Sequence, residues 1–320
     1  MSNIVEVVAY ENNWPELFLA EASLIKEALG ANCITIYHIG STAVPGLSAK
    51  PIIDILPVVK DISLVGNAVS QMVAIGYCYR GEYGIPFRRY FQKFQGDKRT
   101  HHVHIFEVGN SEIDRHLKFR DWMCAHADDR EAYAQLKKEL ALKYPDDILN
   151  YCEGKEAFIA TIDNKSGFTG LRMVQALTKR EWEAVKNLRQ KFFDKGTMND
   201  LYHWTFKDSS HKHLILYKES TIIGYAHIQL CSNNKAILRI IVIEERYRNL
   251  GFGSLFLKYC EKWLAEQNIK EVLVPSSREA YHLYRKNNYV KMSFNDPQNY
   301  PHNPHDIKVG KILRQRLIDQ

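Results

Sequence analysis

A short glycine-containing turn joins two apolar segments in the second half of the chain. The turn reads Arg248-Asn-Leu-Gly251-Phe-Gly253, and residues 236–243 before it form an apolar, β-branched run typical of a buried strand. Apolar residues recur at helical spacing after it. Glycines allow the backbone to approach a ligand closely, and the free N–H groups at a helix start attract a pyrophosphate. The sequence therefore predicts a phosphate-binding turn, to which Arg246 adds positive charge.

This strand, turn and helix resemble motif A of the GNAT N-acetyltransferase superfamily, whose R/Q-x-x-G-x-G/A loop holds the pyrophosphate of acetyl-CoA. The resemblance implies that main-chain groups near Ile241 and Ile243 pair with the pantetheine arm. It assigns pyrophosphate binding to Arg246, Arg248, Asn249, Leu250, Gly251, Phe252, Gly253 and Ser254. Acetyl-CoA is therefore the cofactor expected for the C-terminal half.

The resemblance continues downstream, where residues 278–290 (REAYHLYRKNNYV) are similar to the GNAT motif B helix. In that family a tyrosine of this helix commonly protonates the departing CoA thiolate, and the position falls on Tyr284. The alternative for Tyr284 is a core aromatic on an amphipathic helix, with Tyr281 as its competitor. Asn288 stands where the family usually has glycine, and asparagine accepts a left-handed backbone better than most residues.

The general base is less clearly marked. Many relatives place a glutamate on the strand before motif A, but residues 236–243 contain no acid. His227 on the preceding strand is our candidate, because an unperturbed histidine has a pKa of about 6.5. A packed or surface histidine is the alternative, while Glu244 and Glu245 are expected to be exposed. A water chain with no dedicated base would serve equally well.

A second set of candidate residues lies in the N-terminal half, where Gly40-Ser41 ends one apolar strand and Asp54 lies inside the next. This is the layout of the nucleotidyltransferase superfamily, in which the Gly-Ser turn holds nucleotide phosphate and the following strand presents carboxylates for Mg²⁺. Residues 11–163 resemble the GrpB family (UPF0157) through HIGSTAVPGLSAKPIIDIL, RTHHVHIFEVG and HLKFRDW, in that order. The resemblance implies a nucleotidyltransferase fold.

One residue departs from the pattern of a working nucleotidyltransferase. Such an enzyme presents two acids one residue apart, but the partner position of Asp54 is Leu56. Two-metal phosphoryl chemistry needs bridging acids, so the sequence disfavours it. Asp54 could instead bind a single metal ion, or a basic ligand, together with His102 or His104. These two histidines lie on one face of a predicted strand. A hydrogen-bonded, partly buried histidine pair is the alternative.

Positive charge near this predicted pocket has two interpretations. Lys50, Arg88, Arg89 and Arg99 could supply a polyphosphate site, or each could be an ordinary surface charge. Mg²⁺ or a nucleotide is the candidate ligand. The predicted pocket comprises Gly40, Ser41, Lys50, Asp54, His102 and His104.

The elements that position these residues predict two α/β (α+β) domains. We place the boundary in the polar, turn-rich segment 163–167, which gives residues 1–164 to a GrpB-like mixed sheet with helices and residues 165–320 to a GNAT fold. The first domain is expected to have a helix at 12–29, strands at 33–39, 50–59 and 100–108, and two helices within 114–144. The second is expected to have strands at 171–177, 213–217, 222–230, 236–243, 270–275 and 307–313, and a helix at 199–206. A further helix is expected after residue 178, where Thr178 and Glu181 form a capping box.

Composition and charge limit the function classes. The chain of 320 residues is 45% hydrophobic, without an apolar run of the roughly 20 residues that a membrane span needs. Its six cysteines form no C-x-x-C pair, so we expect no zinc site, no disulfide framework and a cytoplasmic location. The C-terminal half is basic, with 25 Lys+Arg against 15 Asp+Glu in residues 168–320, which suits CoA, nucleic acid or an acidic acceptor.

No nucleic-acid-binding module or dense basic stripe is present, so the expected partner is a small-molecule or peptide amine acceptor. The leading hypothesis is a GrpB-like domain fused to an acetyl-CoA-dependent N-acetyltransferase. Nucleotidyl transfer by the N-terminal domain is the second hypothesis, which Leu56 disfavours. The third is a non-catalytic N-terminal module that senses a nucleotide or a CoA-like ligand. Acceptor identity and oligomeric state are not encoded in any motif.

Overall fold

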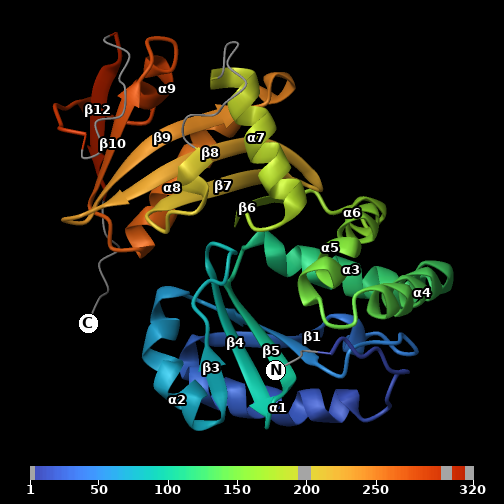
Figure 1. Cartoon of the computed structure of the whole chain (residues 1–320). Helices are drawn as coiled ribbons and strands as arrows, with labels where there is room; N and C mark the ends of the chain where they lie inside the picture. Colours follow the sequence, from blue (N-terminus) through green and yellow to red (C-terminus); the bar gives the residue numbers. More distant parts are fainter. Residues whose placement is uncertain (1–3, 194–202, 297–304, 314–320) are drawn as a thin grey trace. The chain divides into compact units, whose positions relative to one another are not determined.

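The computed structural model describes residues 4–193, 203–296 and 305–313. The chain forms two compact units, one of Met1–Arg172 with Lys218–Ser220 and the other of Met173–Tyr217 with Thr221–Gln320. Each unit has its own β-sheet with helices, as expected for the predicted two-domain α/β fold class (Figure 1). The predicted boundary at 164/165 lies in the last turn of helix α6 (Glu156–Lys165). Among the described residues no helix has the length and apolar content to cross a membrane.

The N-terminal unit is built on a five-stranded mixed sheet in the order β1-β2-β5-β4-β3 (Figure 1). Strands β2 and β5 are parallel, and the other neighbouring pairs are antiparallel. The strands are β1 (Cys33–Ile39), β2 (Ile53–Val59), β3 (Tyr77–Tyr79), β4 (Arg88–Gln95) and β5 (Lys98–Glu107). The longer helices are α1 (Trp14–Leu29), α2 (Val69–Ala74), α3 (Ser111–Ala125), α4 (Ala127–Lys143), α5 (Ile148–Gly154) and α6.

Alternation of side chains along β2 and β5 separates two packed layers. Ile55 and Val103 face the core that includes residues of α1 and α2. Leu56 and Phe106 face the opposite side, where α3 packs. Figure 1 shows α1 and α2 on one side of this sheet and α3 and α4 on the other. Polar residues on the second side of β2 and β5 therefore lie under the helices α3 to α6.

The C-terminal unit is built on a seven-stranded sheet in the order β11-β12-β10-β9-β8-β7-β6. Its strands are β6 (Leu171–Gln175), β7 (His211–Lys218), β8 (Thr221–Cys231), β9 (Lys235–Ile243), β10 (Glu271–Ser276), β11 (Val290–Lys291) and β12 (Ile307–Ile312). Its helices are α7 (Lys179–Phe193), α8 (Phe252–Glu266) and α9 (Tyr281–Lys286), with short 3₁₀ turns at His203–Phe206 and Glu245–Tyr247.

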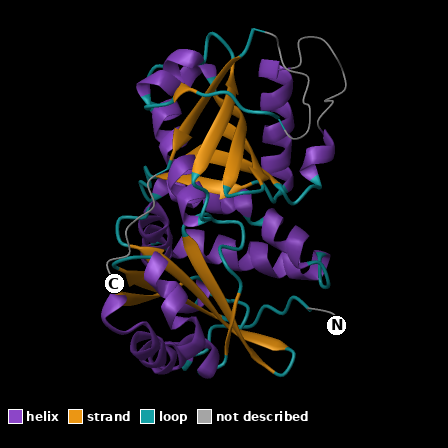
Figure 2. Ribbon diagram, turned by 90° about the vertical axis from the view of Figure 1, so that its left-hand side faces the viewer, coloured by secondary structure: helices purple, strands orange, loops and turns teal. Residues whose placement is uncertain are grey.

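Helices α7 and α8 cover opposite faces of this sheet. Tyr225 and Val242 belong to the core that α7 completes with Val185. Gly224 faces the other way, where a side chain would overlap Ile243 and contact Phe256 of α8. Figure 2 shows helices on both sides of the strands. The sheet is therefore a buried middle layer, and its strand ends are the places where backbone can meet a ligand.

Strands β9 and β10 are parallel neighbours that separate early. Within the described residues, their register joins only Lys235 to Ile237 of β9 with Glu271 to Leu273 of β10. Strand β9 continues to Ile243 and β10 to Ser276. The second half of β9 therefore has a partner on its β8 side but no β10 partner on the other.

One local prediction is confirmed, and two others differ. The capping box is formed, because Glu181 N–H donates to Thr178 Oγ1 at 3.3 Å and Thr178 N–H donates to Glu181 Oε2 at 3.0 Å. The strand expected at 171–177 ends at Gln175. Of the helix expected at 199–206, the described part is a single 3₁₀ turn at His203–Phe206, and residues 199–202 lie outside the described residues.

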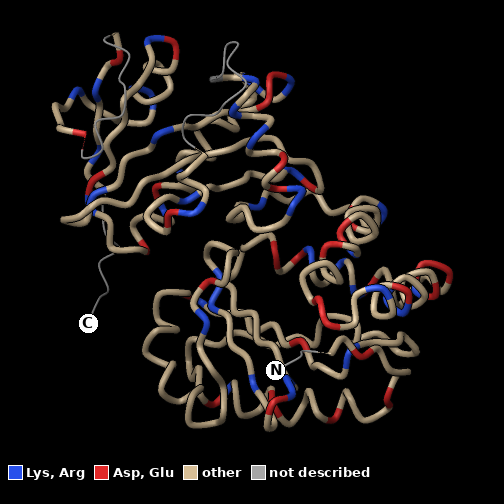
Figure 3. The backbone as a smooth tube through the Cα atoms, in the orientation of Figure 1, with Lys and Arg blue, Asp and Glu red and all other residues tan. Residues whose placement is uncertain are grey.

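A buried ion network ties α3 to its surroundings in the N-terminal unit. Glu112 Oε1 lies 3.2 Å from Arg172 Nη1, and its Oε2 lies 3.6 Å from Arg115 Nη1. Arg115 also donates its Nε–H to Asp163 Oδ2 at 2.8 Å. Figure 3 shows residues of both charge signs along α3 and α4. Burial alone would raise the pKa of Glu112, but the charges of Arg172 and Arg115 lower it to about 2.

This lowered pKa predicts acid sensitivity. The pKa of Glu112 rises to its ordinary value of 4.5 on unfolding, so its contribution is present above pH 4.5 and is lost as the pH falls toward 2. The full contribution is about 3 kcal/mol. We expect Glu112→Gln to destabilise the N-terminal unit at pH 7 and to have little effect near pH 2.

Urea unfolding followed by circular dichroism at several pH values measures this difference. Glu131→Gln is the matched control, because Glu131 is exposed on α4. A stability difference between Glu112→Gln and the native chain that is the same at pH 7 and near pH 2 would contradict the assignment.

Candidate functional site

The glycine-containing turn leads directly into helix α8 in the C-terminal unit. Asn249 and Gly251 have φ angles of 62° and 87°, and α8 begins at Phe252. Among the described residues, a Cβ atom at Gly251 would meet nothing within 4 Å, so in this part of the chain the space before the helix start is open. The first N–H groups of a helix have no intrahelical partner. The turn thus presents unpaired donors, at the positive end of α8, to an open space.

The helix start is attached to its neighbours through small side chains. A Cβ atom at Gly253 would lie 3.6 Å from Leu283 of α9 and 3.9 Å from Ile243 of β9. Asn287 Nδ2 donates to Ser254 Oγ at 3.0 Å and to the Leu283 carbonyl at 2.8 Å. These contacts hold the first turn of α8 against β9 and α9.

The two arginines expected at the phosphate differ in their contacts. Arg248 Nε–H donates to the Ile243 carbonyl at 3.0 Å, and its guanidinium lies 4.6 Å from the centre of the Phe192 ring. Arg246 is exposed, with its guanidinium 4.9 Å from the ring centre of Tyr247. Arg248 therefore fixes the end of β9, and Arg246 has the freer side chain.

The backbone direction at the end of β9 follows from its pairing with β8. Glu244 donates its N–H to the Ile223 carbonyl of β8 at 2.9 Å. Donors and acceptors alternate in direction along an antiparallel strand, so the backbone groups of Ile241 and Ile243 point away from β8. Arg248 already takes the Ile243 carbonyl on that side. The N–H groups of Ile241 and Ile243 and the carbonyl of Ile241 therefore face the side from which β10 has separated.

Tyr284 lies on α9 and is buried, at 4% exposure. Its ring meets that of Tyr289 edge-on at 5.4 Å between centroids. Burial raises the pKa of Tyr284 above its ordinary value, so the hydroxyl keeps its proton at neutral pH. Tyr281, one turn earlier, is half-buried. Asn288 adopts the expected left-handed conformation, with φ of 66°.

His227 lies in the interior of the sheet, at 1% exposure. Its Nε2 is 2.7 Å from His211 Nδ1, and its Nδ1 is 3.5 Å from Arg189 Nη1. Burial, together with the nearby His213 and Arg189, lowers the pKa of His227 well below the ordinary value. Both ring nitrogens therefore have neighbours within the network, which does not favour a base in direct contact with an acceptor.

In the N-terminal unit, Gly40 and Asp54 are packed against each other at the end of β1. Gly40 has φ of 71°, and a Cβ there would overlap Asp54 Oδ2. Asp54 lies on β2 opposite His102 of the parallel strand β5. The side chain of residue 40 must therefore be absent for Asp54 to occupy this position.

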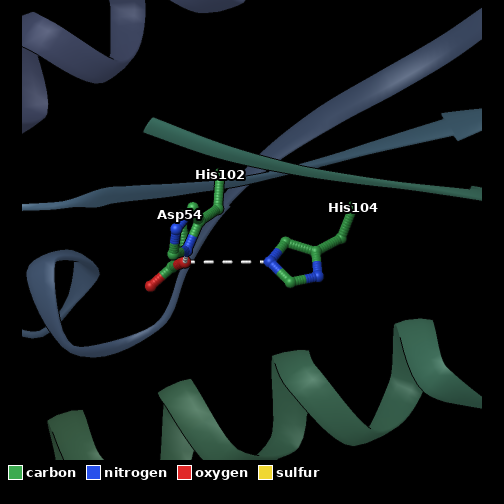
Figure 4. Close-up of side chains that lie close together, drawn as sticks. All are labelled: Asp54, His102 and His104. Carbon is green, nitrogen blue, oxygen red and sulfur yellow. Dashed lines mark hydrogen bonds and ion pairs between the residues drawn. The ribbon is translucent and has the colours of Figure 1, made fainter. Parts of the chain in front are cut away.

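Two imidazoles approach one oxygen of Asp54 (Figure 4). His102 Nδ1 lies 3.1 Å and His104 Nε2 lies 3.7 Å from Asp54 Oδ1. Burial alone would raise the pKa of Asp54, but the hydrogen bonds from His102 and His104 hold it well below the usual range. Burial lowers the pKa of His104 to about 4, so this ring is neutral at pH 7.

Arg88 decides which nitrogen of His104 carries the proton. Its Nη1 lies 3.2 Å from His104 Nδ1, and its other nitrogens donate to the carbonyls of Glu82 and Tyr83. An arginine is always a donor, so His104 Nδ1 accepts and Nε2–H points at Asp54. His104 therefore directs an N–H toward the carboxylate from 3.7 Å.

These residues do not fit a Mg²⁺ site. Leu56, at the position of the second acid, is fully buried in the apolar layer. The cluster of Asp54, His102 and His104 offers a single carboxylate, whereas Mg²⁺ prefers oxygen ligands. His104 Nε2 is occupied by a proton, so it cannot ligate a metal while Arg88 stays in place. Asp54 is therefore held by a hydrogen bond from His102 and faces the N–H of His104.

A cavity of about 320 Å³ brings most of the predicted N-terminal residues together. Gly40, Ser41, Lys50, Asp54, His102 and His104 all line it, and its other lining residues come mainly from α3 to α6. Arg88, Arg89 and Arg99 are not among the lining residues.

Two lining lysines, Lys137 and Lys155, were not predicted. Lys137 lies within the apolar stripe of Tyr133 and Leu140 on α4. A lysine at such a position was the sequence feature by which it could have been identified.

Comparison with known proteins assigns both halves to families. The family model "GrpB protein" matches residues 4–165, and "Acetyltransferase (GNAT) family" matches residues 172–289. The chain is 48% identical over 162 residues to the UPF0157 protein YqkA of Bacillus subtilis, a match that covers 51% of this chain. It spans 47% of the length of that relative.

Solved structures resemble each half separately. The conserved protein GrpB from Enterococcus faecalis has 44% identity and a TM-score of 0.49, covering 50% of this chain and 96% of that one. A GNAT-family acetyltransferase from Staphylococcus aureus Mu50 has 16% identity and a TM-score of 0.39, covering 45% and 100%. The family matches carry the assignment: the chain belongs to the GrpB family through its N-terminal half and carries a GNAT-family acetyltransferase domain in its C-terminal half.

Proposed function

We propose that the chain is an acetyl-CoA-dependent N-acetyltransferase that acts on an amine of a small molecule or peptide. The observation that carries the proposal is the early separation of β9 from β10 beside the start of α8. Within the residues that the structure describes, this arrangement leaves backbone donors of β9 and of the helix start without protein partners on one side. An extended amide-containing arm with a pyrophosphate at one end matches both sets of groups.

In this proposal the backbone of Ile241 and Ile243 pairs with the amides of the pantetheine arm. The turn from Arg248 to Ser254 binds the pyrophosphate, with N–H groups supplied after the left-handed Gly251. Arg246 adds a mobile positive charge, whereas Arg248 acts mainly by holding the Ile243 carbonyl. Binding by backbone groups suits a cofactor because it orients the thioester without flexible side chains.

The amine nitrogen attacks the thioester carbonyl carbon, the carbon–sulfur bond breaks, and the thiolate takes a proton. Tyr284 is the proposed donor, because its hydroxyl is protonated at neutral pH and it occupies the position at which the GNAT motif B helix commonly has its proton-donating tyrosine. The amine loses its proton to solvent, directly or through water. We assign no residue as base, because His227 is buried within its histidine network.

We further propose that residues 1–164 form a GrpB-like domain, appended to the acetyltransferase domain of residues 165–320. A role in ligand sensing is compatible with the charged cavity under α3 to α6. Nucleotidyl transfer lacks support, because the second acid is replaced by the buried Leu56.

The cofactor site predicts a charge-specific binding defect. Gly251→Glu places a carboxylate at the proposed pyrophosphate position, whereas Gly251→Gln adds the same bulk and the same backbone strain without charge. We expect acetyl-CoA to bind the native chain in the micromolar range, and Gly251→Glu to bind at least about ten-fold more weakly than Gly251→Gln. Calorimetric titration of the full chain measures both. Equal affinities for the two variants would argue against a pyrophosphate at this turn.

Tyr284→Phe tests the proton donor. We expect kcat to fall about 100-fold, while the KM for acetyl-CoA changes little, because the ring stays packed and only the hydroxyl is lost. Release of free thiol is followed with a polyamine, an aminoglycoside and a peptide with a free α-amino group as acceptor probes. Tyr281→Phe on the same helix is the matched control. If Tyr281→Phe reduces kcat and Tyr284→Phe does not, the assignment moves to Tyr281.

A further inference from the structure

Three lysines from three segments line the cavity of the N-terminal unit. Lys50 precedes β2, Lys137 lies on α4, and Lys155 lies between α5 and α6. In the part of the chain that the structure describes, none of the three ammonium groups lies within 4 Å of a carboxylate oxygen. Buried or partly buried lysines normally have a counter-charge, so this grouping calls for an explanation.

Lys137 is the most deeply placed of the three, at 2% exposure. Its Nζ donates to Ser41 Oγ at 2.9 Å and to the Ser48 carbonyl, and it lies 4.6 Å from the ring centre of Tyr133. These neutral partners position the ammonium group but do not balance its charge. Burial, with repulsion from Lys155, lowers the pKa of Lys137 to about 7.

Lys50 and Lys155 share one aromatic ring. Their Nζ atoms lie 5.3 Å and 4.5 Å from the ring centre of Tyr151. The ring attracts both cations and holds them near each other. Burial and repulsion from Lys155 lower the pKa of Lys50 to about 8. Two half-buried ammonium groups therefore lie against the same aromatic ring.

The carboxylates that line the cavity do not compensate for these lysines. Asp163 is paired with Arg115 at 2.8 Å. Asp54 accepts from His102 and is approached by His104. With all three lysines protonated, the lining holds two more positive than negative charges. A bound dianion would neutralise this excess and would occupy the space between the ammonium groups.

We infer that the cavity binds a phosphomonoester whose phosphate lies among Lys50, Lys137 and Lys155, without a metal ion. The charge of a phosphate dianion matches the excess positive charge of the lining. At a site with paired carboxylates, a metal ion would neutralise the phosphate. The described residues of this site include no paired carboxylates, and its ammonium groups neutralise the phosphate instead.

The rest of the cavity indicates what the phosphate is attached to. A volume of about 320 Å³ exceeds what inorganic phosphate fills and lies at the lower end for small-molecule pockets. The remaining wall is largely apolar and aromatic, with Phe119, Tyr133 and Ile159. A compact monoester with a flat or apolar body fits these dimensions. The inference is independent of the acetyl-CoA site, because every residue it uses lies in the N-terminal unit.

Calorimetric titration of adenosine 5′-monophosphate and of inorganic phosphate into the full chain, in the presence of EDTA, tests the inference. We expect adenosine monophosphate to bind more tightly than phosphate. We expect Lys137→Met and Lys155→Met each to weaken binding at least about ten-fold. Lys138→Met is the matched control, because Lys138 is exposed and adjacent on α4. Gly251→Glu in the C-terminal unit should leave this binding unchanged, which would show that the probe does not bind at the acetyl-CoA turn.

Three results would overturn the inference. The first is no binding of either probe at millimolar concentration. The second is binding that disappears in EDTA and returns with a divalent metal, which would place a metal at Asp54. The third is binding that Gly251→Glu removes and Lys155→Met leaves intact, which would place the ligand at the acetyl-CoA turn. Circular dichroism of each variant establishes that it is folded.

Discussion

The separation of β9 from β10 after Ile237 is the constraint on which the C-terminal unit depends. A parallel sheet normally satisfies the backbone groups of both strands, and unpaired groups in a buried layer are costly. Here α8 starts beside the opening, and the Ile243 carbonyl is taken by Arg248. The other backbone groups of β9 on this side have no partner among the described residues and require water or a ligand, which supports the proposed acetyl-CoA site.

The N-terminal unit depends on a different interaction, the contact of Asp54 with two imidazoles. Gly40 lacks a side chain so that Asp54 can occupy its position, and Arg88 sets the protonation of His104. The carboxylate is thereby committed to internal hydrogen bonds. It does not pair with the lysines across the cavity, which leaves their charge for a ligand. Among its described lining residues, the cavity of this unit therefore contains three ammonium groups and no paired carboxylates.

Much of the architecture was predictable because its signals are local. The capping box at Thr178, the alternation along β5 and the glycine turn before α8 each depend on residues within one or two turns of chain. The predictions were less accurate where distant segments decide the outcome. His227 was the candidate base, with a packed or surface histidine as the alternative, and its burial depends on how α7 covers β8. Lys137 and Lys155 were missed because only the packing of α4 and α6 brings them to Asp54.

The two candidate anion sites attract phosphate by different kinds of charge. At α8, backbone N–H groups and the helix dipole attract the phosphate, and these partial charges are present at every pH. In the N-terminal cavity, full charges on buried lysines attract it, and burial and mutual repulsion weaken those charges until an anion arrives. Ligand binding and lysine protonation are therefore coupled in one unit and uncoupled in the other.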